Sequence, residues 1–239
     1  MLMRRGGRRA AGVLVSGGAM LALAGCGGDG EGSAPDAAES ADPSKVQSLV
    51  LPADDFPAGF EVQEIPADQL QSMTDQILEE TKNAEITPAS CVQLGLMPEH
   101  VDTSDVGLAV ATSGTTNLGT AVTTTSPSMA DQRAALSGKC AHLTVKMTSG
   151  AAAGAEGTVD QKEVPAPASR ADEALAVEQE STSTVSGTTT ETKSLLGFAT
   201  VNGYTVTVQY TSLNAGDLDR AVFDEFFVSA VDHVADATS

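Results

Sequence analysis

The sequence predicts a single α+β domain whose central sheet is mainly antiparallel. Three observations predict this class. Segments rich in Val and Thr, with apolar and polar residues alternating, recur between residues 105 and 211. Two of them are joined by Asn202-Gly203, a pair typical of tight antiparallel hairpins. Helical patterns of apolar residues at about 66–83 and 217–234 stand on either side of the strands, an arrangement that belongs to the α+β class.

The first part of the predicted body contains an extended segment and a helix. Residues 49–62 predict a short strand or extended stretch with a turn at Pro57-Ala58-Gly59. Pro66 stands near the start of the helix at about 66–83. The apolar positions that share one face of this helix are Leu70, Met73, Ile77 and Leu78. We expect this stripe to contact the core rather than to form a groove for a partner.

Several strands and a short helix follow along the chain. The expected strands are 105–112, 118–125, 142–147, 158–164 and 174–191, with a short helix at about 128–136. Thr and Ser crowd residues 181–192, which favours a strand that faces solvent or lies at an edge. The same composition is compatible with O-linked sugars there and at 123–128.

The hairpin at 194–211 has a register that its turn determines. A type I′ turn at Asn202-Gly203 needs positive φ at both positions and places Val201 opposite Tyr204. The residues that then share one face are Leu195, Gly197, Ala199, Val201, Tyr204, Val206, Val208 and Tyr210, while Thr200, Thr205, Thr207 and Gln209 point the other way. We expect the apolar face to be covered by the helix at about 217–234. Its stripe comprises Leu218, Val222, Phe226, Phe227, Ala230, Val231 and Val234.

The N-terminus predicts a lipoprotein signal peptide over residues 1–25. Four arginines (Arg4, Arg5, Arg8 and Arg9) precede an apolar stretch at 10–24 that is too short and too rich in Gly for a stable transmembrane helix. Leu23-Ala24-Gly25-Cys26 resembles the bacterial lipobox, in which the Cys is lipidated and becomes the first residue. The alternative is an ordinary secretory signal, which would leave Cys26 as a free thiol.

A lipidated Cys26 would hold the protein on the extracytoplasmic side of the cell membrane. Residues 26–45 are predicted to form an acidic, flexible tether, and residues 46–239 the folded domain. Cleavage would remove four arginines and no acid, so the net charge would change from −19 to −23. A body this acidic is repelled by anionic lipid and has no electrostatic attraction for nucleic acid.

The two remaining cysteines, Cys91 and Cys140, form an even pair in a compartment that permits disulfides. We expect them to be bonded, which would stabilise the fold by up to about 4 kcal/mol through a loop of roughly 50 residues. The alternative is a redox-active or nucleophilic Cys. It has less support, because the sequence contains no CxxC and no His adjacent to either cysteine.

No sequence motif for catalysis or cofactor binding is present. His100, His142 and His233 are isolated, and no HExxH, GxSxG or GxxxxGK[ST] occurs. Glu99-His100 places a carboxylate beside an imidazole, although a loop His in solvent explains it as well. We therefore predict no catalytic residue, no metal ligand and no cofactor.

Several features together resemble one group of proteins. These are the lipobox, the acidic tether, the segment Leu49–Val62 (LVLPADDFPAGFEV), Pro88-Ala89-Ser90-Cys91 and the second cysteine at 140. They resemble actinobacterial, mycobacterial-type envelope lipoproteins with a sensor-like domain of unknown function, similar in style to the extracellular domain of a membrane Ser/Thr kinase. The resemblance implies an α+β fold with a central antiparallel sheet and a cleft for a ligand. It transfers no functional residue.

Three functions follow as hypotheses. The first is a non-catalytic, lipid-anchored protein that binds an envelope ligand or acts as a sensor. The second is a protein-interaction module of the cell envelope. The third is a hydrolase whose catalytic groups are dispersed, such as His100 or His142 with a distant Ser and Asp. The hairpin face at Tyr204 and Val206 discriminates between the first two: a filled core favours the interaction module, and an open cavity favours ligand binding.

Overall fold

The computed structural model describes residues 41–63, 65–94, 103–124, 126–150, 152–213 and 216–239. Helices and strands follow in this order: η1 Pro43–Leu49, η2 Ala53–Asp55, β1 Glu61–Gln63, α1 Ala67–Lys82, β2 Ala84–Thr87, η3 Ala89–Leu94, η4 Thr103–Asp105, β3 Val106–Ser113, β4 Thr116–Thr123, α2 Met129–Leu136, η5 Gly138–Ala141, β5 His142–Met147, β6 Glu156–Val164, β7 Glu173–Val185, β8 Thr188–Val201, β9 Tyr204–Leu213 and α3 Arg220–Ala237. The η elements are 3-10 helices.

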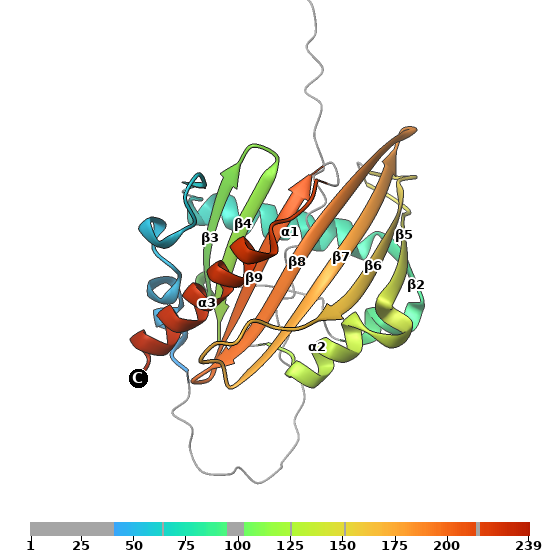
Figure 1. Ribbon diagram of the computed structural model, residues 1–239. Helices are drawn as coiled ribbons and strands as arrows, with labels where there is room; N and C mark the ends of the chain where they lie inside the picture. Colours follow the sequence, from blue (N-terminus) through green and yellow to red (C-terminus); the bar gives the residue numbers. More distant parts are fainter. Residues whose placement is uncertain (1–40, 64, 95–102, 125, 151, 214–215) are drawn as a thin grey trace, which may run out of the picture.

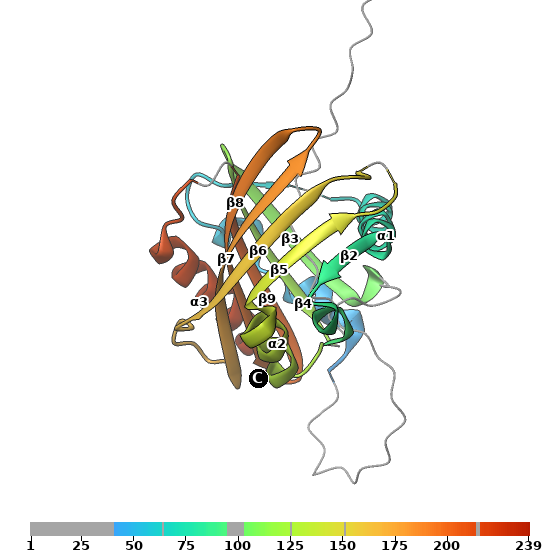
Figure 2. The same ribbon diagram turned by 90° about the vertical axis from the view of Figure 1, so that its right-hand side faces the viewer.

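The strands of the described residues form one sheet. Their order is β1-β3-β4-β9-β8-β7-β6-β5-β2, and every neighbouring pair is antiparallel. Helix α3 lies across one face of this sheet, while α1 and α2 lie on the other (Figures 1 and 2). The predicted α+β class with an antiparallel sheet is therefore confirmed.

The β8–β9 hairpin has the register that the sequence predicts. Val201 pairs with Tyr204, and the pairing continues through Leu195 and Tyr210. Both turn residues have positive φ, 48° at Asn202 and 83° at Gly203. The tight turn therefore determines which hairpin residues face α3.

Helix α3 fills the face that it covers. The side chains of Phe223, Phe226 and Phe227 are at most 1% exposed. They belong to the same core cluster as Tyr204 and Val206, which are 5% and 0% exposed. Gly197 allows this contact, because a Cβ on it would lie 2.5 Å from the Phe227 ring. The predicted C-terminal helix is confirmed as the main cover of the apolar face, and the structure describes a filled core beneath it.

Residues 41–45, which the sequence assigns to the tether, lie against the folded body in the structure. Asp42 caps η1 by accepting a hydrogen bond from the backbone N of Ser44, and its own backbone N donates to the Tyr204 hydroxyl at 2.9 Å. Side-chain and backbone hydrogen bonds from Ser44 lower the pKa of Asp42. Val46 then packs over β3, where Gly107 leaves no room for a side chain, since its Cβ would lie 2.1 Å from the Val46 carbonyl oxygen. Leu49 thus ends a 3-10 helix instead of opening a strand.

Helix α1 forms where expected, but its predicted core stripe is only partly buried. Leu78 is buried against Val106, whereas Met73 is 45% exposed. The most buried positions are Thr74 and Leu78, so the side of α1 facing the protein is rotated away from Met73. The expectation that the whole stripe contacts the core is wrong for Met73, because α1 meets the rest of the protein along its Thr74 side.

The stretch 174–191 is two strands instead of one. Ser186 and Gly187 form a turn with φ values of 52° and 82°, and β7 and β8 pair on either side of it. Residues 181–184 are also paired with β6, so this part is not an edge strand. The expected solvent exposure does hold at the hairpin tip, where residues 185–191 are exposed.

The loop between β6 and β7 holds the C-terminal end of α3. Arg170 donates from Nη1 to Asp236 Oδ1 at 2.7 Å and from Nε to Asp232 Oδ1 at 3.2 Å. Hydrogen bonds to Asp236 and then Asp232 raise the pKa of Arg170, and the Arg170 bond lowers the pKa of Asp236. A positive group near the carboxyl end of a helix also complements the helix dipole.

Candidate functional site

The two cysteines of the predicted body are bonded to each other. Cys91 in η3 and Cys140 in η5 form a disulfide with a Cα–Cα distance of 5.6 Å, so the predicted pairing is confirmed. Both residues are buried, at 8% and 5% exposure. In the disulfide state neither sulfur is a free nucleophile, which leaves the alternative of a reactive thiol without support.

Two groups of predicted residues lie outside the described part of the chain. They are the lipobox with Cys26 (residues 23–26) and the Glu99-His100 pair. His142 is described and lies on β5, where its Nδ1 is 2.7 Å from Asp160 Oδ1. Both side chains are more than 60% exposed. Among the described residues no hydrogen bond links His142 to a serine.

The face that carries α3 is open over its other half. Helix α3 packs on β8 and β9, while none of the described helices lies on the same face over β5, β6 and the adjacent part of β7 (Figure 1). We call this surface the open face. Its outward side chains on the described strands are Glu85, Thr87, His142, Thr144, Lys146, Glu156, Thr158, Asp160, Lys162, Glu178, Glu180, Thr182, Glu191 and Lys193.

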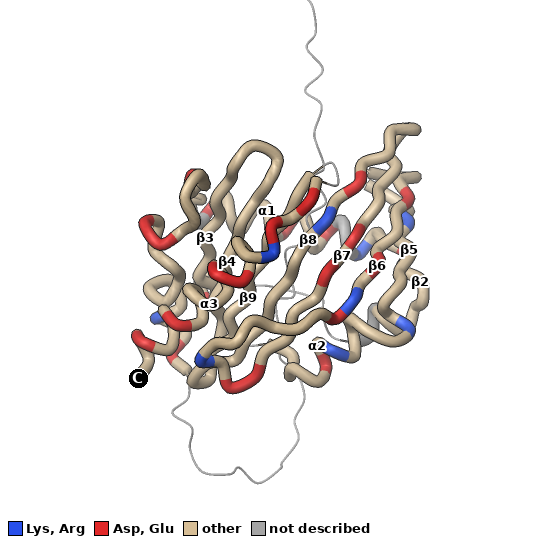
Figure 3. The backbone as a smooth tube through the Cα atoms, in the orientation of Figure 1, with Lys and Arg blue, Asp and Glu red and all other residues tan. Residues whose placement is uncertain are grey.

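Charges of both signs alternate across the open face (Figure 3). Two cross-strand ion pairs lie on it, Lys146–Glu156 at 2.9 Å and Lys193–Glu180 at 3.3 Å. The hydrogen bond to Glu156 raises the pKa of Lys146. Such a surface is polar, well hydrated and unsuited to burying an apolar ligand, but its charge pattern can be matched by the surface of another macromolecule.

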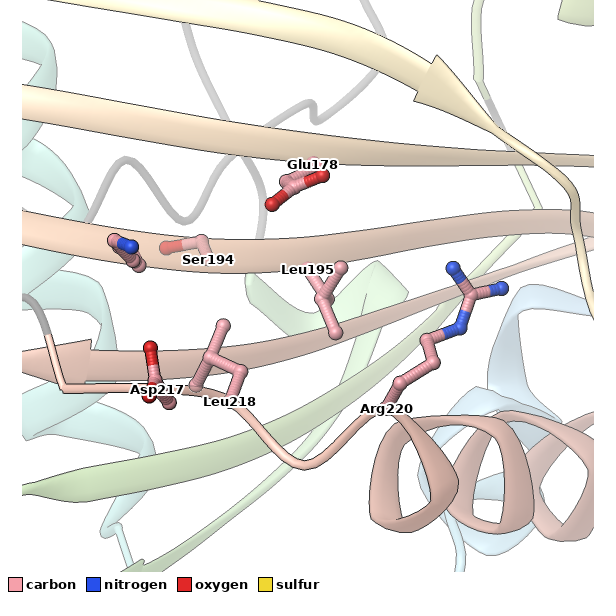
Figure 4. A pocket seen from close by; sticks show the side chains of 7 residues that line it. Glu178, Ser194, Leu195, Asp217, Leu218 and Arg220 are labelled. Atoms are coloured by element: carbon pink, nitrogen blue, oxygen red, sulfur yellow. The ribbon is translucent and has the colours of Figure 1, made fainter.

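A cleft of about 320 Å³ lies where the open face meets the start of α3. We call it the border cleft. Its lining residues are Glu178 from β7, Lys193, Ser194 and Leu195 from β8, and Asp217, Leu218 and Arg220 from the segment that leads into α3. Figure 4 shows Glu178 on one side of the cleft and Asp217 on the other, with Leu218 beside Asp217 and Leu195 farther toward Arg220. The cleft therefore combines carboxylates at its rim with two leucines.

The cations of the border cleft already have partners, whereas its carboxylates do not. Lys193 is paired with Glu180, and Arg220 donates from Nε to Asp224 Oδ1 at 2.6 Å and from Nη2 to the Pro165 carbonyl. In the part of the chain that the structure describes, neither the Glu178 nor the Asp217 carboxylate has a hydrogen bond or an ion pair. Lys162 pairs opposite Glu178 on β6. Together with Glu180, Asp224 and Lys162, the charged groups of the cleft have a net charge of −1.

None of the border-cleft residues is predicted as part of a site from the sequence. A signal was nevertheless present in β8, because Lys193 occupies the same alternating series as Leu195, Gly197 and Ala199. A charged residue that continues an apolar series marks the point where the cover of the sheet ends. The contribution of Asp217 and Arg220 depends on how α3 is placed, which the strand pattern alone does not give.

Neither a metal centre nor a membrane span is found among the described residues. They contain no group of three or more His, Cys, Asp or Glu side chains placed to hold a metal ion. Within the same residues, no helix is both long and apolar enough to cross a membrane.

These features define an α+β domain with a single sheet, in which α3 covers one half of a sheet face and the other half of that face is open. Residues 42–234 match the sequence profile of the family described as Domain of unknown function (DUF5642), so the protein belongs to that family. This match confirms the expected assignment to a domain of unknown function.

Two solved structures resemble the chain, and both are mycobacterial. One is a putative uncharacterised protein of Mycobacterium smegmatis, the Rv0999 ortholog, with 17% identity, coverage of 83% of this chain and 100% of that chain, and a TM-score of 0.45. The other is the extracellular domain of PknH from Mycobacterium tuberculosis, with 12% identity, coverage of 84% and 98%, and a TM-score of 0.42. No curated protein matches the chain.

Proposed function

We propose that this protein is a non-catalytic, lipid-anchored binding domain that recognises a protein partner on the extracytoplasmic side of the cell membrane. The observation that carries the proposal is the division of one sheet face. Helix α3 fills the apolar half at Tyr204 and Val206, and the other half is an open polar surface. A filled apolar half has no space for an apolar ligand, whereas an open charged half can dock a complementary surface.

The anchor is part of the same proposal. Leu23-Ala24-Gly25-Cys26 supports lipidation at Cys26, and more than one acyl chain is needed for stable attachment. Because Ala41 already packs on the core, the proposed tether comprises residues 27–40. On the flexible-coil estimate, fourteen residues span roughly 20 Å, which together with the acidic charge would keep the domain off an anionic leaflet. A Cys26→Ala variant should lose incorporation of a palmitate analogue and move from the membrane to the soluble fraction.

Photo-crosslinking from defined positions tests the partner proposal in intact cells. A photoreactive residue at Thr144, exposed on β5 of the open face, should give one dominant adduct. The same residue at Ser72, exposed on α1 on the opposite side of the sheet, is the matched control and should not. The adduct should weaken when the salt concentration is raised before irradiation. Equal adducts from both positions, or none from Thr144, would contradict recognition through the open face.

A second candidate function is the binding of a small ligand in a sensor-like role, which the border cleft favours. Its volume of about 320 Å³ lies at the lower end of the range for ligand sites. Thermal-shift screening of small envelope solutes tests this candidate. Stabilisation that is lost in a variant of the cleft would support it. Either function is non-catalytic, so a fluorophosphonate probe should leave the purified protein unlabelled.

A further inference from the structure

We propose that the border cleft binds a linear aliphatic primary amine. The inference rests on the proposed binding function and adds the chemistry that the cleft recognises. The amine could belong to a free small molecule or to a lysine side chain on a protein partner, and the two share the same ammonium group and methylene stem.

The pairing of charges determines the sign of the ligand. Glu180 and Asp224 stand outside the cleft and engage its two cations, Lys193 and Arg220. Together with the Glu178 and Asp217 carboxylates and with Lys162, which pairs opposite Glu178 on β6, these groups carry four negative and three positive charges. The Asp219 side chain accepts a hydrogen bond from the Ala221 backbone N, so the first turn of α3 is already capped by a carboxylate. An ammonium group is therefore attracted, and a carboxylate ligand would compete with ion pairs that already exist.

The apolar lining determines the rest of the ligand. Leu195 pairs opposite Glu178 and is 6% exposed, so a small part of its side chain reaches the cleft. Leu218 adds a second apolar side chain from the segment before α3. A chain of methylene groups can lie against both leucines while its ammonium group reaches a carboxylate at the rim. This division matches the way lysine stems bury their methylenes and keep the charged end in a polar setting.

The choice between amine and other cations follows from size and shape. A volume of about 320 Å³ accommodates an amine with a stem of several carbon atoms, and it is small for a folded element of a partner. A guanidinium group is planar and prefers two-pronged contact with one carboxylate, whereas an ammonium group is a compact charge that needs no planar partner. A compact ammonium on a flexible stem uses both parts of this cleft.

The test is a titration of the full mature chain followed by NMR or calorimetry. The probes are n-pentylamine, 1,5-diaminopentane and, as the charge-reversed control, pentanoate. We expect both amines to bind and pentanoate to bind at least ten-fold more weakly. The variants Glu178→Gln and Asp217→Asn keep the size of the side chain and should each weaken amine binding by roughly 3–10-fold. Asp75→Asn, on the exposed side of α1, is the matched control and should bind like the wild type.

A second experiment, with peptides, distinguishes a free small-molecule amine from a lysine side chain of a protein partner. A short peptide with a single lysine should compete with n-pentylamine if the ligand is a side chain, and its norleucine analogue should not. If free amines bind and the lysine peptide does not compete, the source is a small molecule.

Two results would overturn the assignment of an amine site. They are equal binding of pentanoate, and unchanged amine affinity in both Glu178→Gln and Asp217→Asn. Absence of amine binding with retained crosslinking from Thr144 would overturn the cleft chemistry and leave the interaction function standing. Amine binding without crosslinking from Thr144 would overturn the interaction function and leave the cleft chemistry standing.

Discussion

Replacing Gly197 by alanine should destabilise the domain by about 2 kcal/mol, because α3 packs directly on this position of β8. A Cβ on Gly197 lies 2.5 Å from Cδ2 and 2.7 Å from Cε2 of Phe227. Carbon atoms in contact are normally about 3.5–4.0 Å apart, so the ring would have to retreat by roughly 1 Å. Phe227 is fully buried within the core cluster, so a shift of its ring would displace its neighbours. Overpacking of this kind costs about 1–3 kcal/mol.

Urea and thermal unfolding measure the effect, and Tm should fall by roughly 4–8 °C for a domain of this size. The double variant Gly197→Ala/Phe227→Leu tests whether the contact with Phe227 is the cause. Leucine at position 227 is smaller than phenylalanine and makes room for the added methyl group. The destabilisation of the double variant should therefore be smaller than the sum of the two single variants by about 1 kcal/mol. Ser183→Ala, at an exposed position of β7, should leave Tm nearly unchanged. An unaltered Tm in Gly197→Ala, or strict additivity in the double variant, would refute the packing argument.

Three further outcomes are expected. Replacing both Cys91 and Cys140 by alanine should lower the free energy of unfolding by up to about 4 kcal/mol, measured in urea, since the bond closes a sequence separation of 49 residues. Tyr204→Phe removes the hydroxyl that accepts a hydrogen bond from the Asp42 backbone N. It should lower the free energy of unfolding by about 1 kcal/mol and expose the segment around Asp42 and η1 to limited proteolysis. The hydrogen bonds described above lower the pKa values of Asp42 and Asp236 from 3.8. The two carboxylates therefore stabilise the fold above pH 3.8, and this stabilisation is lost as the pH falls through their lowered pKa values. Asp42→Asn and Asp236→Asn should therefore be less stable than the wild type at neutral pH and approach it in acid, as a pH series of urea unfolding curves would record.

The features that could be predicted from sequence are those that local chemistry determines. The Asn202-Gly203 turn needs positive φ at both residues, and this requirement alone sets the register of β8 and β9. The apolar stripe of α3 repeats over the whole helix, so its buried side follows from periodicity. The pairing of Cys91 with Cys140 follows from parity once Cys26 is assigned to the anchor.

The features that could not be predicted lack this local contrast. Along 181–192 nearly every residue is Thr, Ser or Glu, so alternation gives no difference between faces and the turn at Ser186-Gly187 is obscured. The stripe on α1 identified the helix but not the side that meets the protein, because Thr74 takes the buried place that Met73 was expected to share. Tertiary contacts with β3 and η4 decide that rotation, and they are not encoded in the helix itself.

The border cleft shows how a change of pattern in one strand produces a candidate site. On β8, the residues that face α3 are apolar from Val201 to Leu195, and Lys193 is the first charged one. On β7 the same change occurs between Ala176 and Glu178. A helix as apolar as α3 can cover the sheet only up to that line, since burying Lys193 or Glu178 beneath it would leave a desolvated charge. Because α3 begins there and the charged strands continue beyond it, the cleft is lined by both leucines and charged side chains. The same pattern of residues thus determines both where the core ends and the mixed chemistry on which the proposed amine site depends.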